Sequence, residues 1–361
     1  MTFRPLLIKL HLWVALATGV FLLIVAVSGI IVVFSPALDR AMRPELLTVV
    51  PGPSRLPLDT LVALARKEGM PAVALVPRDA DESLMIFFMN AKKKPASMYI
   101  DQYTGAVLGI KTIAEQQSGF LLRTRTFHRN LLMGKGGEQV VAAVTALSIF
   151  MALTGLVLWW PRKIVRVKRG ASLSRLNFDL HNMVGLFTSA LLLVLSVTGV
   201  VIAYPAVGKL VDRFNPPGLV EPSYPAPAGL TPLSLDSLAI IGTSAIPGSA
   251  PAAISLPAPK SAVINMGLRL PDEPGNATRS RVWIDRFTGK ILRVDNGRNP
   301  TAGQNRSNIH LVIAMLHTGV LFGWITGTLV VLGAVGQIVL VITGVLIWIK
   351  RTFRTPRPRA A

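Results

Sequence analysis

Two of the five histidines in this sequence open long apolar runs that resemble each other. "LHLWVALATGVFLLIVAVSGIIVVF" (10–34) contains His11, and "LHNMVGLFTSALLLVLSVTGVVIAY" (180–204) contains His181 at the same position. A neutral imidazole binds transition metals or haem iron, and a protonated one transfers a proton. An imidazole in or beside a bilayer is rare enough to indicate function. His11 and His181 are therefore candidates for one chemical site.

A second matched pair of histidines lies farther along the chain. His128 leads into "LTGLVLWWPR" (153–162), and His317 leads into "ITGVLIWIKR" (342–351), with 26 residues from each histidine to the threonine. Gapless spacing over such stretches indicates an internal duplication. The four histidines thus form two equivalent pairs.

Four roles are open to these paired histidines. Helix packing through a hydrogen bond is the simplest. A proton path would usually add intramembrane acids, which the apolar runs lack, and a bare zinc or copper site needs more than two histidines. Haem b needs one or two axial histidines and an apolar slot between helices. Small residues leave room for its flat macrocycle: Gly19, Ala26, Gly29, Gly185, Ser189, Ala190 and Gly199.

Haem b is therefore the preferred interpretation, with two haems per chain. The sequence predicts that His11 and His181 ligate one haem iron and that His128 and His317 ligate the other. Two haems at different depths would form an electron path across a membrane.

Four apolar runs must position these histidines. Each is long enough to cross a bilayer, which takes about 20 residues. Backbone in lipid must satisfy its own hydrogen bonds, so each run is a predicted helix. The first is too long for the core of a signal peptide, and we expect it to be retained. The runs are 10–34, 139–160, 182–205 and 327–349.

Basic residues predict the orientation of these spans. Segment 161–180 and the C-terminal tail are rich in Lys and Arg, and short basic segments stay in the cytoplasm. Both termini are therefore expected inside, and the long segments 35–138 and 206–326 outside. The formal net charge of +20 is then largely a topology signal, and nucleic acid is not an expected partner.

The chain has no cysteine, which excludes disulfides, thiolate metal sites, iron–sulfur clusters and c-type haem attachment.

The two outward segments also resemble each other. "SMYIDQYTGAVLGI" (97–110) and "RVWIDRFTGKILRV" (281–294) each alternate apolar residues on both sides of a Thr-Gly turn, which predicts a β-hairpin. A short helix is predicted before each hairpin, at 56–69 and 230–242. Each half of the chain is thus a span, a small α+β segment and a second span.

The predicted fold is a membrane protein with an all-α transmembrane four-helix core, built from two parallel repeats that each carry a small periplasmic α+β domain. Parallel repeats are related by an axis along the membrane normal. His11 and His181 should then face each other near the cytoplasmic side, and His128 and His317 near the outer side.

The predicted boundaries are a first transmembrane helix at 1–34, a first periplasmic domain at 35–127, an interfacial segment and second transmembrane helix at 128–161, a basic cytoplasmic loop at 162–180, a third transmembrane helix at 181–205, a second periplasmic domain at 206–308, an interfacial segment and fourth transmembrane helix at 309–350, and a basic cytoplasmic tail at 351–361.

His310 and four arginines complete the candidate residues. His310 lies seven residues, two helical turns, before His317 and so on the same helix face. It is either an interfacial polar residue or an alternative outer ligand or substrate-side residue. The arginines either contact solvent and lipid headgroups or pair with haem propionates or an anionic substrate. They are Arg123, Arg125, Arg129 and Arg306.

The doubled "LH…G" span starts, the "TG-x-x-x-W" span ends and the "YIDQYTG"/"WIDRFTG" hairpins together resemble the PepSY-associated transmembrane family over nearly the whole chain. Characterised relatives include bacterial inner-membrane ferric-siderophore reductases with two b-type haems. The resemblance implies an oxidoreductase of iron acquisition, which passes electrons from the cytoplasmic side to a periplasmic ferric siderophore or other ferric chelate. The four paired histidines match the family's histidine positions.

The electron donor is not encoded in a recognisable motif. The sequence has no G-x-G-x-x-G after a predicted strand, so neither flavin nor nicotinamide binding is expected. The donor is then a separate reductase, a quinol or a soluble reductant, and no catalytic residue is assigned.

Two other functions remain open. A non-catalytic membrane sensor or peptidase modulator would not need paired histidines, and an iron or chelate permease is disfavoured by four spans without acids.

Overall fold

The computed structural model describes residues 3–112, 115, 119–160, 170, 172–214, 221–256, 260–273, 280–297 and 309–353. The chain divides into two compact units. The helical unit comprises Met1–Ser35, Arg123–Phe214 and Asn308–Ala361. The sheet unit comprises Pro36–Leu122 and Asn215–Ser307. Most of the predicted basic loop and the end of the C-terminal tail lie outside the described residues.

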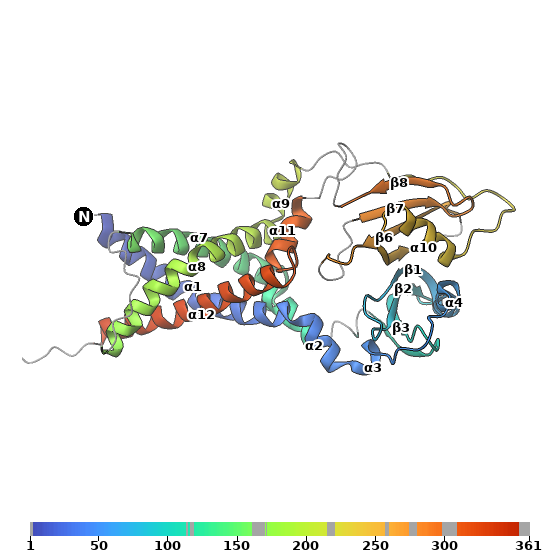
Figure 1. The fold of residues 1–361 in the computed structure, drawn as a ribbon. Helices are drawn as coiled ribbons and strands as arrows, with labels where there is room; N and C mark the ends of the chain where they lie inside the picture. Colours follow the sequence, from blue (N-terminus) through green and yellow to red (C-terminus); the bar gives the residue numbers. More distant parts are fainter. Residues whose placement is uncertain are drawn as a thin grey trace, which may run out of the picture. The chain divides into compact units, whose positions relative to one another are not determined.

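Four long helices form the helical unit (Figure 1): α1 (Phe3–Val33), α7 (Gly134–Trp159), α8 (Leu173–Ala203) and α12 (Trp324–Thr352). Each is long and apolar enough to cross a membrane, and they are the only such helices among the described residues. The four predicted spans are therefore confirmed. Three shorter helices belong to the same unit: α6 (Phe120–Asn130), whose first residues belong to the sheet unit, α9 (Pro205–Asp212) and α11 (Ile309–His317).

The third span begins earlier than its hydropathy predicts. α8 starts at Leu173, nine residues before the predicted run at 182. The side chain of Ser172 accepts a hydrogen bond from the amide of Arg175, and this N-cap supports a polar first turn. The added turns of the helix include Asp179, whose side chain is buried.

Small residues allow the long helices to pack closely. A Cβ on Gly336 of α12 would overlap the side chain of Thr188 of α8, and one on Gly333 would lie 2.9 Å from Cδ1 of Leu195. Lipid tails are as apolar as leucine, so close backbone packing of this kind is what holds transmembrane helices together.

The sheet unit contains one eight-stranded antiparallel sheet in the order β4-β3-β2-β1-β5-β6-β7-β8. Its first half also contains the short helices α2 (Ser35–Met42) and α3 (Pro44–Leu47). The first four strands are β1 (Gly69–Leu75), β2 (Leu84–Asn90), β3 (Pro95–Ile100) and β4 (Val107–Thr112). The other four are β5 (Ala250–Ser255), β6 (Val263–Arg269), β7 (Ser280–Asp285) and β8 (Ile291–Asp295).

Both predicted hairpins are confirmed, as β3–β4 and as β7–β8. Each half of the sheet has the α+β content predicted for one repeat. In addition, β1 pairs with β5, and this pairing joins the two halves into one sheet.

One face of the sheet is covered by α4 (Leu58–Glu68) and α10 (Leu235–Ser244), the two helices predicted before the hairpins. Alternate residues of each strand point to this core because side chains alternate along a strand. In β2 and β6 the core residues are Leu84, Ile86, Phe88, Ile264, Met266 and Leu268.

The two helices exchange their N-terminal caps. The amide of Leu235, the first residue of α10, donates to Asp59 Oδ2 of α4 at 2.7 Å. The amide of Leu58, the first residue of α4, donates to Asp236 Oδ2 of α10 at 2.9 Å. A carboxylate at a helix N-terminus satisfies an otherwise unpaired amide and interacts favourably with the helix dipole. The exchange ties the two repeats together at their helices as well as at their strands.

We expect Asp59→Ala and Asp236→Ala each to lower the free energy of unfolding of the sheet unit by about 1 kcal/mol. Each variant leaves one helix amide without its carboxylate acceptor. Hydrogen exchange of the strand amides in the full chain measures the change. Glu68→Ala, at an exposed acid at the other end of α4, is the control and should leave protection unchanged. Equal effects of all three substitutions would contradict the capping role.

Candidate functional site

The inner histidines each hydrogen-bond to a threonine of another span. His11 Nδ1 of α1 lies 2.8 Å from Thr154 Oγ1 of α7. His181 Nδ1 of α8 lies 2.8 Å from Thr343 Oγ1 of α12. Each threonine donates its hydroxyl proton to the carbonyl four residues earlier in its helix, at 2.8 and 2.6 Å. The threonine oxygen can therefore only accept from the histidine.

The outer histidines repeat this arrangement, but they lie on short helices and not on the spans. His128 Nδ1 of α6 lies 2.9 Å from the Val25 carbonyl oxygen and 3.2 Å from Ser28 Oγ of α1. His317 Nδ1 of α11 lies 2.9 Å from Thr198 Oγ1 of α8. The hydroxyls of Ser28 and Thr198 each donate to the carbonyl four residues earlier, at 2.7 Å. The histidine nitrogen must again be the donor.

All four imidazoles are thereby held in one tautomer. The proton sits on Nδ1, because every oxygen that faces Nδ1 is an acceptor. Nε2 then carries a lone pair. A histidine that ligates a metal through Nε2 usually donates its other N–H to an oxygen in this way. The arrangement can thus present four metal-binding nitrogens from four different helices.

A glycine follows each of these hydroxyl residues, and it makes room for the imidazole. We call the four dipeptides the Ser/Thr-Gly pairs. A Cβ added to the glycine would lie 3.6 and 3.5 Å from the histidine Cε1 at the inner sites and 3.0 and 3.2 Å at the outer sites. The glycines are Gly155, Gly344, Gly29 and Gly199, in that order.

The histidines occupy two levels along the bundle. Seventeen residues of α1 separate His11 from Ser28, and seventeen residues of α8 separate His181 from Thr198. At a helical rise of about 1.5 Å per residue, the two levels are about 26 Å apart. Each level holds one matched pair of histidines.

The structure brings the two outer histidines near each other. The ring centroids of His128 and His317 are 6.5 Å apart, with an angle of 52° between the ring planes. His11 and His181 each contact a threonine of another span at the inner level. The side chains of the outer pair therefore lie together as the duplication predicts, and the pairing of the inner histidines stays a prediction.

A sequence model of the PepSY-associated TM region matches residues 8–351, which include all five histidines. The chain belongs to this family. A search of curated proteins finds no match. The family and the four candidate spans identify the chain as a multi-pass membrane protein that contacts the lipid bilayer.

His310 has a different environment in this PepSY-associated protein. It lies on α11 and packs on Gly208 of α9, where an added Cβ would lie 3.2 Å from its Cε1. Its Nδ1 lies 3.9 Å from Asp212 Oδ1, and both side chains are partly exposed. The duplication gives His310 no matched histidine, because Leu121 stands at the corresponding position.

The candidate arginines that the structure describes lie on the exposed side of α6. Arg123, Arg125 and Arg129 are exposed, and Arg129 Nε lies 3.4 Å from Glu138 Oε1. Arg306 lies outside the described residues. Contacts of these arginines with propionates or an anionic substrate stay a prediction.

Two polar residues of the PepSY-associated bundle were not predicted as part of the inner level. The Asn177 side chain donates to the Thr343 carbonyl at 3.0 Å. Asp179 has a fully buried carboxylate, and its Oδ1 lies 2.9 Å from Arg175 Nε. The hydrogen-bonding role of the Ser/Thr-Gly pairs was also missed, although the repeated dipeptides were a visible signal.

Proposed function

We propose that the chain holds two b-type haems and passes electrons across the bacterial inner membrane from a donor on the cytoplasmic side to a periplasmic ferric chelate. In this proposal the protein is a ferric-siderophore reductase of iron acquisition. His11 and His181 would hold one haem, and His128 and His317 the other. The donor would be a separate reductase, a quinol or a soluble reductant.

One observation carries the proposal: all four paired histidines use Nδ1 as a donor to a neighbouring helix, and no hydrogen bond within the described residues engages their Nε2. A histidine that only packs helices can use either nitrogen, so four identical arrangements favour ligation over packing. No group of three or more metal-ligating side chains occurs among the described residues, as a bare zinc or copper site would require. Haem needs only the imidazoles.

The outer histidines also lie close enough together for both to hold one haem. Their ring centroids are 6.5 Å apart. His128 and His317 would each supply an imidazole nitrogen to its iron.

Haem supplies reversible one-electron chemistry when it is bound. The chain's own contribution is to orient the ligands and exclude water. The Ser/Thr-Gly pairs fix the tautomer and ring direction of each histidine, and the hydrogen bond to Nδ1 raises the basicity of Nε2. The apolar helix faces keep the surroundings at low polarity, which tunes a redox potential.

The absorption spectrum of the detergent-purified protein, oxidised and dithionite-reduced, tests the proposal. We expect b-type bands and about two haems per chain by pyridine haemochromogen assay, because each of the two histidine pairs could supply axial ligands to one haem. The reduced protein should then be reoxidised by ferric chelates. A protein that is folded and free of haem, after expression with ample haem supply, would refute the reductase. A membrane sensor or peptidase modulator would then be the working alternative.

A further inference from the structure

Four exposed basic residues gather at one end of the helical unit. Arg123, Arg125 and Arg129 lie on the exposed side of α6, and Lys135 is exposed in the first turn of α7. We call these four residues the α6 basic surface. Glu138 is the only acidic residue of α6 and α7, and its Oε1 lies 3.4 Å from Arg129 Nε. Four positive charges against one negative charge leave the surface with a net charge of +3.

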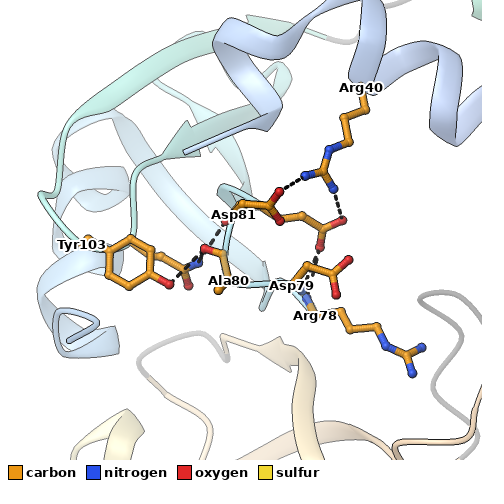
Figure 2. A network of polar contacts seen from close by, with 8 residues as sticks. Arg40, Arg78, Asp79, Ala80, Asp81 and Tyr103 are labelled. Carbon is orange, nitrogen blue, oxygen red and sulfur yellow. Dashed lines mark hydrogen bonds and ion pairs between the residues drawn. The ribbon is translucent and has the colours of Figure 1, made fainter. Parts of the chain in front are cut away.

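Two of these arginines lack an acidic partner on the chain. In the sheet unit, Figure 2 shows the partly exposed Arg40 paired with Asp81. Among the residues that the structure describes, no carboxylate lies within ion-pair distance of Arg123 or Arg125. Glu138, the nearest acid along the helices, is paired with the third arginine. The two guanidinium groups are therefore available to a partner outside the chain.

The first turns of α7 indicate the depth of this surface. Lys135 and Glu138 stand before the apolar run 139–160, which crosses the membrane. Charged side chains are costly inside the hydrocarbon, so these turns lie at the level of the lipid headgroups. The 3.4 Å contact between Glu138 and Arg129 places the end of α6 at the same level. The basic surface therefore lies where lipid phosphates are.

Exposed apolar side chains accompany the basic residues. In the turn between α6 and α7, Leu132 is 53% exposed and Met133 is 65% exposed. Basic and apolar side chains exposed together are typical of a segment that lies in the membrane interface. Arginine and lysine can also lay their apolar stems along lipid while the charged group stays near water. The surface thus matches a phospholipid, which presents a phosphate above its acyl chains.

The second repeat shows that the fold does not require these charges. α11 presents His317 to a hydroxyl of α8 as α6 presents His128 to α1. With the spacing that aligns these two histidines, uncharged residues stand at all four positions of the basic surface. They are Val312, Ala314, Thr318 and Trp324. The predicted orientation also places this end of the spans outside, where short segments usually carry few Lys and Arg, so topology does not explain the charges.

We propose that the α6 basic surface binds the phosphates of phospholipids with a net negative headgroup, such as phosphatidylglycerol. A guanidinium binds a phosphate through two parallel hydrogen bonds. A basic segment beside the membrane is attracted to anionic lipids, whereas the ammonium group of a zwitterionic lipid opposes the net positive charge. Because α6 carries His128, the bound lipid would also stabilise the outer site of the reductase, a step that rests on that proposed function.

Lipid binding to the full chain in phosphatidylcholine vesicles tests the proposal, with spin-labelled phosphatidylglycerol and spin-labelled phosphatidylcholine as probes. The wild type should bind phosphatidylglycerol more tightly, and about 1 M NaCl should reduce this preference because salt screens the charges. Arg123→Gln/Arg125→Gln should lower the preference roughly tenfold, because each substitution removes one positive charge beside the headgroups. Each single substitution should remove part of the preference.

Arg66→Gln/Lys67→Gln, at two exposed basic residues of α4, is the matched control and should keep the wild-type preference. Equal binding of both lipids by the wild type, or equal losses in the two double variants, would overturn the proposal. Inorganic phosphate that abolishes the preference at constant ionic strength would indicate a site for soluble anions and would also overturn it. Haem content is measured in the same vesicles, so a lipid preference in haem-free protein supports this proposal while it refutes the reductase.

Discussion

Replacing His317 by alanine is expected to remove one of the two proposed haems and leave the other in place. The substitution deletes one Nε2 ligand of the outer level and leaves the inner level, about 26 Å away along the bundle, intact. The haem content should fall from about two to about one per chain, and reoxidation by a ferric chelate should fall to background. His128→Ala should give the same result, whereas His11→Ala and His181→Ala should remove the inner haem.

The matched control is His310→Ala, which removes an imidazole from the same helix as His317. It should retain two haems, because His310 packs on α9 and not on a Ser/Thr-Gly pair. Imidazole added to His317→Gly should restore the outer signal if the loss is one of ligation. Loss of both haems in every variant, or two haems in His317→Ala, would contradict the two-level arrangement.

Replacing the glycines of the Ser/Thr-Gly pairs by alanine should weaken haem binding at the outer level and leave the inner level unchanged. In Gly29→Ala the new Cβ would lie 3.0 Å from His128 Cε1. In Gly199→Ala it would lie 3.2 Å from both His317 Cε1 and Thr145 Cγ2. These distances are tighter than ordinary contact, so the imidazole must move away from its hydroxyl acceptor. Disturbing the partner of a ligating histidine typically costs about 10–100-fold in affinity, and we expect this loss for the outer haem.

Gly155→Ala and Gly344→Ala are the controls at the inner level. Their added Cβ would lie 3.6 and 3.5 Å from the histidine Cε1, which is ordinary van der Waals contact. Both should bind two haems. Alanine also has a higher helix propensity than glycine, by about 1 kcal/mol, so a loss at the outer sites cannot come from a weaker helix. Titration of haem into the apoprotein measures all four variants, and equal behaviour of inner and outer glycines would contradict the packing argument.

The sheet unit shows how two weak repeats gain stability from each other. Each half contributes four strands and one covering helix, and a domain this small buries a smaller fraction of its surface than a larger one. Pairing of β1 with β5 and the exchange of Asp59 and Asp236 as helix caps give both halves one continuous core. The same pairing places Arg78 next to the end of β6.

The sequence by itself determined the four spans, the duplication, both hairpins and the family. These features depend on local patterns: apolar runs of bilayer length, alternation around Thr-Gly turns and gapless spacing between histidines and threonines. The pairing of His128 with His317 also followed, because a duplication with parallel repeats places equivalent residues opposite each other. The start of α8 at Leu173 was missed, since its polar first turns depend on the Ser172 cap and not on hydropathy.

Only the tertiary structure decided which nitrogen each histidine presents and what holds it. His11 bonds to Thr154 and His181 to Thr343, residues 143 and 162 positions apart, and no local pattern specifies that a hydroxyl of one span meets an imidazole of another. The join of β1 to β5 is likewise a property of packed segments distant in sequence. Hydropathy indicates whether a segment prefers lipid or water. The tautomer of a histidine and the partner of a buried charge depend instead on which other segment of the chain packs beside that residue.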